Sequence, residues 1–564
     1  MDEIYSCHFK RRFEMKLSLS SIQNRDVWTA AGIVLPAYDV ESSAAKAKAA
    51  PRWVHFGIGN IFRVFIGGIA DNLLEAGVLD RGITCIEPFD FDVVDKIYRP
   101  FDNLALSVIL HSDGKRDIRV LGFGAEAVKA RSEVPKDWNR MKEIFRSPDL
   151  QIVSFTVTEK GYALKDPDGA FLPHVKADLE GGPDRAVSVI PIVTAMLNER
   201  FLAGGQPVAL VSMDNCSHNG ELLRHTVLTV AEEWKKRNYI TEDFYGYVRD
   251  EGRVAFPWTM IDKITPRPSS EIATDLEALG MEDMQPLITG KRTYIAPFAN
   301  AEGPQYLVIE DSFPNGRPGL ERGRGVYLAD RKTVNLAERM KVTACLNPVH
   351  SALGPIGVVY GIDLFADLLD DAALLELGKT VAYREGMPVI EDPGIISPEA
   401  FADELFNDRF PNRYLGDTNL RLCTDITQGF SVRFGETIKS YVARDGSAAA
   451  LSAIPFGIAG CMRYALGIDD HGNAYELAPD PLIPGIHERL SDVEIGKPES
   501  YHGQLRLVLS NENIFGIDLF EAGIGERIEE IFVEMIAGPG ACRKTVESEY
   551  LGTANKKEER LALR

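Results

Sequence analysis

The first half of the chain alternates short β-type runs with helical patterns, and this alternation limits the possible folds more than any other feature. "RWVHFGIG" (52–59) predicts a strand that ends in glycines, and "IFRVFIGGIADNLLEAG" (61–77) predicts the helix after it. More strands are predicted at "GITCIE", "LALSVIL", "DIRVLGF", "LQIVSFTVT" and "PVALVSMD". Strands separated by helices form a largely parallel sheet with helices on both faces, so we expect a doubly wound α/β domain.

The second half changes character from about Gly325 onward. "LADRKTVNLAERMKVTAC", "SPEAFADELFNDRF" and "GERIEEIFVEMIAGPG" have helical periodicity, and few alternating β-branched runs remain. A chain of 564 residues is longer than one hydrophobic core normally serves. We therefore predict an α/β domain at residues 1–325 and a mainly α-helical domain at 326–564, joined at the Pro/Gly-rich segment 312–325.

The net charge of −21 at pH 7 argues against nucleic acid or an acidic membrane surface as a partner. An anionic small molecule can still bind, because the local charge of a cleft can differ in sign from the net charge. No apolar run of signal-peptide length opens the chain, and Met15 is a second possible start, which leaves open whether the first fourteen residues are native. Residues 343–362 are long enough for a membrane span, but their prolines, asparagine and histidine favour a buried core segment. We expect a cytoplasmic protein that binds a small molecule, as a monomer or a small homo-oligomer.

The cysteines are scattered along the chain without a C-x-x-C pair. An odd and dispersed set is typical of reduced thiols in a cytosolic protein. Cysteine and histidine are not grouped at zinc-ligand spacing, so we predict no metal site. The seven cysteines are Cys7, Cys85, Cys216, Cys345, Cys423, Cys461 and Cys542.

A dinucleotide site is indicated at the first predicted turn. Gly57 and Gly59 stand where the strand turns into a helix, and glycines there let the backbone approach a pyrophosphate. The third glycine of the usual fingerprint is absent, with Phe62 in its place, and a tight structural turn is the competing interpretation. Glu87, or else Asp90, closes the second strand and would bind the adenosine ribose, which favours NAD and leaves NADP open.

The segment "ERMKVTACLNPVHSALG" (338–354) sets three polar side chains, Lys341, Asn347 and His350, among apolar residues. Such a composition predicts burial, and a buried lysine is costly unless the protein uses it.

Seven stretches together resemble the long-chain mannitol dehydrogenase family of polyol and hexuronate oxidoreductases. The resemblance implies a Rossmann-like dinucleotide-binding N-terminal domain, a helical C-terminal domain, and an active site in the cleft between them. It also implies metal-independent hydride transfer between NAD(P) and a sugar carbon, with Asn60, Arg63 and Thr158 in cofactor-binding segments. The matching stretches are "GIGNIFR", "IVSFTVTEKGY", "LVSMDNCSHNGE", "FPWTMIDKITPRP", "VIEDSF", the 338–354 segment and "RFGETIKSY".

The same resemblance assigns catalytic roles. It makes Lys341 the acid–base, which partial burial would suit by lowering its pKa. It makes Asn215 and Asn347 donors to the substrate oxygen, His350 an orienting group for substrate hydroxyls, and Glu338 a gate on the proton path. Each role has a plainer alternative: a surface lysine, a helix cap at Asn347, a core histidine, and an i,i+3 ion pair for Glu338.

Two departures from the family pattern bear on the substrate. The interval from Lys341 to Asn347 is one residue longer than usual and Pro348 follows, so a bulge or break must precede Pro348, since one residue rotates a helical position by about 100°. This spacing steers the assignment toward the fructuronate reductase (mannonate oxidoreductase) branch. The second departure is Gly429, which stands where the family has a substrate-binding lysine; either Arg433 or Lys439 replaces that cation, or the substrate differs.

By resemblance, Asp214, Arg421 and Arg433 are expected to bind substrate. The leading hypothesis is an NAD(P)-dependent oxidoreductase of the fructuronate/mannonate type. The alternatives are a polyol 2-dehydrogenase acting on mannitol or arabinitol, a non-catalytic sugar- or nucleotide-binding homologue, and an epimerase that uses bound NAD.

Overall fold

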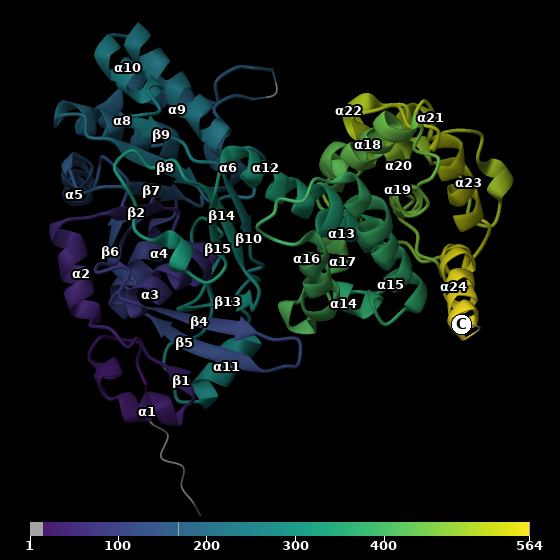
Figure 1. The fold of residues 1–564 in the computed structure, drawn as a ribbon, viewed down its shortest axis with the longest axis horizontal. Helices are drawn as coiled ribbons and strands as arrows, with labels where there is room; N and C mark the ends of the chain where they lie inside the picture. Colours follow the sequence, from purple (N-terminus) through teal and green to yellow (C-terminus); the bar gives the residue numbers. More distant parts are fainter. Residues whose placement is uncertain (1–14, 167, 563–564) are drawn as a thin grey trace, which may run out of the picture. The chain divides into compact units, whose positions relative to one another are not determined.

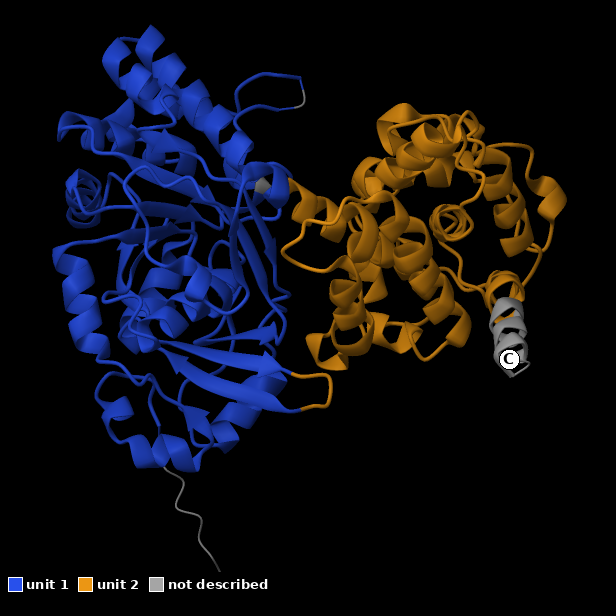
Figure 2. Cartoon of the chain, in the orientation of Figure 1, with its two compact units in different colours: residues 1–110, 115–334 blue, residues 111–114, 335–564 orange. Residues whose placement is uncertain are grey.

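The computed structural model describes residues 15–166 and 168–562, so the question of the first fourteen residues lies outside the described part. The chain forms two compact units (Figure 2). Among the described residues, unit 1 contains those up to Leu110 and Lys115–Val334, and unit 2 contains His111–Gly114 and those from Asn335 onward.

Unit 1 is built on a six-stranded sheet in the order β6-β3-β2-β7-β8-β9 (Figure 1). Every neighbouring pair in this sheet is parallel, which confirms the predicted parallel sheet. Numbered along the chain, the order is 3-2-1-4-5-6, in which the direction of strand addition reverses between β2 and β7. The strands are β2 Trp53–Phe56, β3 Ile83–Glu87, β6 Gly124–Lys129, β7 Ile152–Phe155, β8 Val208–Ser212 and β9 Val254–Ala255.

Smaller sheets complete unit 1. The predicted strands at "LALSVIL" and "DIRVLGF" form, as β4 Ala105–Leu110 and β5 Arg116–Leu121, but they pair antiparallel and belong to a separate sheet of order β1-β5-β4-β13. The sequence shows no helix between these two runs, which is what a hairpin allows and a parallel crossover does not. The remaining strands are β1 Ile33–Val34, β10 Thr259–Asp262, β11 Leu287–Ile288, β12 Tyr294–Ile295, β13 Phe298–Glu302, β14 Tyr306–Glu310 and β15 Val326–Ala329.

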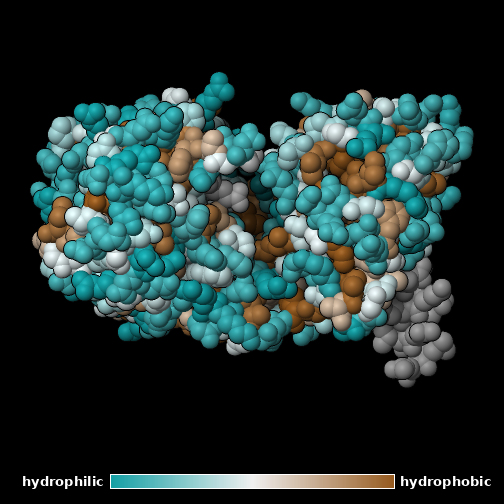
Figure 3. All heavy atoms as spheres, turned by 90° about the horizontal axis from the view of Figure 1, so that it is seen from above, coloured by the Kyte–Doolittle hydropathy of each residue, from teal (hydrophilic) through white to brown (hydrophobic). Residues whose placement is uncertain are grey.

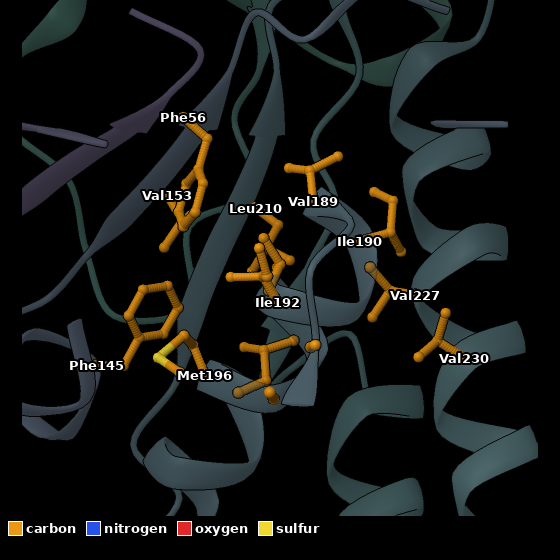
Figure 4. Packing of buried hydrophobic residues seen from close by; sticks show 14 of the residues in the cluster. Phe56, Phe145, Val153, Val189, Ile190, Ile192, Met196, Leu210, Val227 and Val230 are labelled. Atoms are coloured by element: carbon orange, nitrogen blue, oxygen red, sulfur yellow. The ribbon is translucent and has the colours of Figure 1, made fainter. Parts of the chain in front are cut away.

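Helices cover both faces of the central sheet. Side chains alternate along a strand, so Val208 and Leu210 belong to one hydrophobic cluster while Ala209 and Val211 belong to another. Figure 4 shows the first cluster, where strand residues meet helical residues such as Ile192 and Val227. Besides short 3-10 turns, the helices of unit 1 are α1 Arg25–Ala30, α2 Val40–Ala49, η2 Phe62–Ile66, α3 Gly67–Glu75, α4 Phe91–Val93, η3 Val94–Tyr98, α5 Pro135–Arg146, α6 Thr158–Tyr162, α7 Pro173–Gly181, α8 Val189–Leu202, α9 Asn219–Lys236, α10 Glu242–Arg249 and α11 Ser270–Ala278.

Unit 2 is helical, as predicted. Helices α13 and α19 pack closely, because Gly457 and Gly460 leave room for Ala352 and Ile356 of the facing helix. The carboxylate of Glu385 accepts hydrogen bonds from the first backbone N–H groups of α19. Its longer elements are α12 Arg331–Arg339, which begins in unit 1, η7 Met340–Cys345, α13 Asn347–Val359, α15 Ala372–Lys379, η8 Thr380–Gly386, α16 Pro398–Glu404, η10 Leu405–Arg409, η13 Ser431–Gly435, α18 Glu436–Asp445, α19 Ala453–Tyr464, α20 Ile483–Arg489, α23 Gly525–Met535 and α24 Ala541–Ala562.

The short elements of unit 2 connect these helices. They are α14 Phe365–Leu368, η9 Met387–Val389, η11 Arg413–Leu415, α17 Asn419–Leu422, η12 Ile426–Gly429, η14 Pro498–Ser500, α21 Arg506–Leu509 and α22 Glu512–Phe515.

One continuous helical segment of the described residues, Arg331–Val359, is long and apolar enough by composition to cross a membrane. Its most apolar window is 78% buried inside the protein, as in the core helix of a globular unit. This agrees with the predicted buried core segment. In the view of Figure 3 the surface is mostly hydrophilic, with small hydrophobic areas between.

The six described cysteines are buried and form no disulfide; Cys7 lies outside the described residues. No group of three or more His, Cys, Asp or Glu side chains in the described part of the chain is arranged to hold a metal ion.

Candidate functional site

The loop after β2 lies at the point where strand order reverses, which is where sheets of this order bind ligands. Gly57 has a φ of +90°, and a Cβ atom there would lie 2.2 Å from the carbonyl oxygen of Thr156, at the end of β7. The Thr156 hydroxyl donates to the Gly57 carbonyl at 2.7 Å. Only glycine fits this close approach of two loops, so the tight-turn interpretation holds for Gly57.

Gly59 differs, because a Cβ atom there would meet nothing within 4 Å. Beside it, Asn60 lines a pocket of about 570 Å³ together with Arg267, Arg292, Ile288, Thr293 and Tyr294. Neither arginine has a carboxylate partner among the described residues. Open space over a glycine and two uncompensated guanidinium groups suit the phosphates of a dinucleotide. Sequence reasoning missed both arginines; the "FPWTMIDKITPRP" stretch contains Arg267, but Arg292 lies in no motif.

Arg63 is buried and donates its hydrogen bonds inward. Its guanidinium binds the carbonyl oxygens of Ala296 and Phe298 at 2.8 and 3.2 Å and the Asn60 Oδ1 atom at 2.7 Å. These bonds fix the orientation of Asn60, a role that the sequence did not predict, and the cofactor contact at Arg63 stays a prediction.

Glu87 ends β3 and Asp90 follows it, and both carboxylates accept hydrogen bonds from loop groups. The Glu87 carboxylate accepts from the N–H groups of Ile58, Phe89 and Asp90, at 3.2, 2.9 and 3.0 Å. Burial raises the pKa of Glu87, and these three donors oppose the rise. Asp90 accepts from the Thr289 hydroxyl at 2.5 Å. Glu87 thus holds the glycine loop through Ile58, a role the sequence pattern did not predict.

Asp214 and Thr158 form the next part of the same sheet edge. The Asp214 carboxylate accepts from the N–H groups of Val157 and Thr158, both at 3.1 Å, and from the Tyr162 hydroxyl at 2.6 Å. Burial raises the pKa of Asp214, while these bonds lower it. Thr158 has a φ of +64°, a strained conformation for a β-branched residue that often marks functional sites. These contacts of Asp214 hold the turn, and its contact with substrate stays a prediction; the adjacent Asn215 is exposed on the same edge.

A buried hydrogen-bond chain lies beneath the glycine loop. His55, inside β2, contacts the Ser154 hydroxyl through Nδ1 at 2.7 Å and the Thr156 hydroxyl through Nε2 at 2.9 Å. Its ring stacks on Phe62, with centroids 4.0 Å apart. Burial holds the pKa of His55 well below its usual range, so the ring is neutral. The chain continues through Thr156 to the Gly57 carbonyl and supports the loop from below.

In unit 2, Lys341, Asn347 and His350 lie on the helical segment Arg331–Val359. Residues Met340–Cys345 form a π-helix, η7, in which the Leu346 N–H donates to the Lys341 carbonyl five residues back. A π-turn accommodates an extra residue and often occurs at functional sites. This confirms the predicted irregularity before Pro348. Lys341 is 7% exposed, which rules out a surface lysine on an amphipathic helix.

Asn347 is the first residue of α13 and does not cap it, because the N-cap position is Leu346 and has no side-chain cap. Its Oδ1 atom is buried and has no hydrogen-bond partner among the described residues. The cap interpretation is therefore wrong, and the amide is left available for a ligand.

Glu338 precedes Lys341 in the sequence, and His350 follows Asn347. The His350 ring packs edgewise on Phe365, with centroids 4.6 Å apart, and against Phe410 at 5.1 Å. His350 remains partly exposed. Glu338 is a partly exposed residue of α12, one helical turn before Lys341.

The three predicted or possible substrate cations of unit 2 differ in their partners. Arg421 is 60% exposed and pairs with Asp417, and Lys439 pairs with Glu436. Arg433 instead donates to the Ser351 hydroxyl at 2.9 Å.

Two family models match the chain. The mannitol dehydrogenase Rossmann domain matches residues 51–321, and the mannitol dehydrogenase C-terminal domain matches residues 334–535. D-mannonate oxidoreductase from Thermotoga maritima is 48% identical over 535 residues, which cover 94% of this chain and 98% of the relative. Polyol:NADP oxidoreductase from Gluconobacter oxydans is 30% identical, covering 85% of this chain and 90% of the relative.

The fold agrees with these matches. The structure of Pseudomonas fluorescens mannitol 2-dehydrogenase, solved as a ternary complex with NAD and D-mannitol, superposes with a TM-score of 0.71 at 24% identity. The superposition covers 95% of this chain and 99% of that one.

Proposed function

Because the chain belongs to the mannitol dehydrogenase family and is thus a sugar or sugar-acid oxidoreductase, we propose that it interconverts a keto-sugar acid and its hydroxy acid, of the fructuronate–mannonate type. The observation that carries this proposal is the 48% identity, over 94% of the chain, to a D-mannonate oxidoreductase. The Rossmann domain implies a nicotinamide cofactor, which accepts or donates the hydride when bound.

We propose NAD as the preferred cofactor and NADP as the alternative. Glu87 and Asp90 are buried carboxylates at the end of β3, the position next to the adenosine ribose in dinucleotide sheets of this order. Negative charge there disfavours an additional 2′-phosphate. Arg267 and Arg292, beside Asn60, would hold the phosphates that both cofactors share.

Lys341 is proposed as the acid–base. Its amine would take the proton of the substrate hydroxyl during oxidation and return it to the carbonyl oxygen during reduction. Burial on η7 supports this role, because the proton then exchanges with the substrate and not with bulk water. The role also accounts for a lysine in so apolar a segment.

The amides and the imidazole would position the substrate around that proton transfer. The Asn347 side chain has an unsatisfied Oδ1 atom that would accept a hydrogen bond from a substrate hydroxyl or from the ammonium group, while its NH₂ group donates to the developing oxyanion. Asn215, exposed beside Asp214 at the ligand edge of unit 1, would supply a second donor. His350, partly exposed on α13, would orient a neighbouring substrate hydroxyl.

The test is steady-state oxidation of NADH and of NADPH with a panel of keto-uronates and ketoses. We expect turnover with fructuronate, a higher kcat/KM with NADH than with NADPH, and a fall in kcat of more than about a hundredfold for Lys341→Ala. Lys379→Ala, which removes an ammonium from α15, is the matched control and should keep full activity. No turnover across the panel, with NADH binding intact, would leave a binding protein and refute the proposal.

A polyol 2-dehydrogenase is the second candidate, favoured by the 30% identity to a polyol:NADP oxidoreductase. The two functions are separated by comparing uncharged fructose with fructuronate. A kcat/KM that is higher for fructose would favour the polyol assignment.

A further inference from the structure

Arg433 is a partly buried cation without a carboxylate partner among the described residues. It lies in η13, and no carboxylate of the described residues pairs with its guanidinium. Among the described residues, its guanidinium donates a hydrogen bond from the Nη1 atom to the Ser351 hydroxyl. Burial alone holds the pKa of Arg433 below its usual range. A guanidinium in this state has several N–H donors left for a ligand, and an anion would lower the cost of burying its charge.

The guanidinium occupies space that a missing side chain leaves open. A Cβ atom at Gly429 would lie 2.4 Å from Arg433 Nε, 2.7 Å from Cζ and 2.8 Å from Cδ. Gly429 ends the short helix η12, four residues before Arg433, so the two positions lie on the same side of the turn. The Arg433 side chain can therefore adopt this position only because residue 429 has no side chain.

Ser351 connects this cation to the proposed catalytic helix. It is fully buried on α13, four residues after Asn347 and hence on the same helical face. Helix α18, which follows Arg433, also contacts the segment that carries Lys341. The Thr437 hydroxyl donates to the Thr343 carbonyl at 3.1 Å, and Arg339 pairs with Glu436 at 3.3 Å. Arg433 thus faces the Asn347 side of α13 from an element that packs on η7.

We infer that Arg433, lying over Gly429 and held by Ser351, binds the carboxylate of the sugar-acid substrate and sets the preference for acids over neutral ketoses. This rests on the proposed function and names its substrate-recognising group. A planar guanidinium matches a carboxylate with two parallel hydrogen bonds. A neutral polyol or ketose leaves the buried charge uncompensated, so it gains less from the same site.

The other cations of unit 2 near these elements fit the role less well. Lys439 is neutralised by Glu436, and Arg421 is exposed and paired with Asp417. A carboxylate that bound either of them would have to displace an existing ion pair.

The experiment compares kcat/KM for fructuronate and for fructose at saturating NADH in Arg433→Gln and Arg433→Lys. Because Arg433→Gln removes a charge-assisted pair, we expect kcat/KM for fructuronate to fall about 10- to 150-fold and kcat/KM for fructose to fall less than about threefold. Arg433→Lys keeps the positive charge but loses the planar guanidinium, so its kcat/KM for fructuronate should lie between those of the wild type and Arg433→Gln. Arg444→Gln, an exposed arginine of α18 paired with Asp445, is the matched control and should change neither value.

Gly429→Ala is the second variant, because it keeps the cation and moves it. Its acid-to-ketose ratio should fall in the same direction, and it supplies the same test if Arg433→Gln does not fold. Equal losses for both substrates, or an unchanged ratio in Gly429→Ala, would overturn the inference. A wild-type enzyme inactive on both substrates would instead refute the proposed function, so the two failures are distinct.

Discussion

The Asn347 amide shows how one residue can be kept for function at the expense of stability. Its Oδ1 atom is buried without a hydrogen-bond partner among the described residues, and such an atom costs about 1–3 kcal/mol of folding free energy. A residue retained under this cost is expected to gain its partner from a ligand. The stability and activity of an Asn347 variant should therefore move in opposite directions.

We predict that Asn347→Ala leaves the free energy of unfolding unchanged or raises it by up to about 1 kcal/mol, because the unsatisfied carbonyl is removed. The same variant should lower kcat about 10²- to 10³-fold through loss of a donor to the oxyanion. Urea unfolding and steady-state kinetics measure the two effects. Asn412→Ala, which removes a side-chain cap outside the proposed site, should show the reverse pattern of lower stability and normal kcat.

Residue roles were the part of the site that the sequence predicted least well. The sequence predicted ligand contacts at four positions and did not predict their contacts with the backbone of neighbouring loops: Gly57, Glu87, Arg63 and Asp214. Motif spacing places a residue at the ligand edge of a sheet, but which way its side chain turns depends on partners distant in the sequence. Arg63, for example, is directed inward by carbonyl groups at positions 296 and 298.

At the scale of elements, the loop after β2 separates two kinds of glycine. Gly57 has a left-handed φ and lies against the Thr156 backbone, whereas Gly59 has space above it. The first glycine is required by the fold, and the second leaves room for a ligand.

A pair of alanine variants tests this difference. Gly57→Ala should lower the free energy of unfolding by about 2 kcal/mol or more, because the backbone of both loops must move. Gly59→Ala should change it by less than about 0.5 kcal/mol and weaken NADH binding about tenfold or more, since the methyl group fills the phosphate space. Denaturant unfolding and NADH fluorescence titration give both values. Wild-type NADH affinity in Gly59→Ala would show that the cofactor does not use this loop.

Elements were predicted more reliably than residue roles. The apolar runs of β2, β3, β7 and β8 and the helical periodicity after Gly325 depend on local pattern alone, and all of these elements form. The sequence did not predict the central strand β6, nor β1 and β9–β15. Among these, the strands of two to four residues are too short to show a periodic pattern. The π-helix η7 was foreseen only as an unspecified bulge, from the long interval between Lys341 and Asn347.

At the scale of the whole molecule, the net charge of the chain has the same sign as the proposed substrate. The chain carries −21 overall, yet its proposed substrate is an anion and its proposed recognition group is the partly buried cation Arg433. The two effects act over different distances. Repulsion by the net charge is long-ranged and is screened by salt within about 10 Å at 0.1 M, whereas a buried contact pair is screened much less.

The salt dependence of kcat/KM should therefore show how much the long-range repulsion slows substrate binding. Between about 20 and about 200 mM KCl, at saturating NADH, kcat/KM for fructuronate should rise by up to about threefold, because screening weakens the repulsion that opposes encounter. Fructose is neutral, so its kcat/KM should stay flat and serves as the control for any effect of salt on the protein itself. A fall for fructuronate with added salt would mean that cations near the site dominate the field that an approaching substrate meets. In Arg433→Gln the rise should persist at a lower kcat/KM, since that variant removes the contact and leaves the long-range repulsion in place.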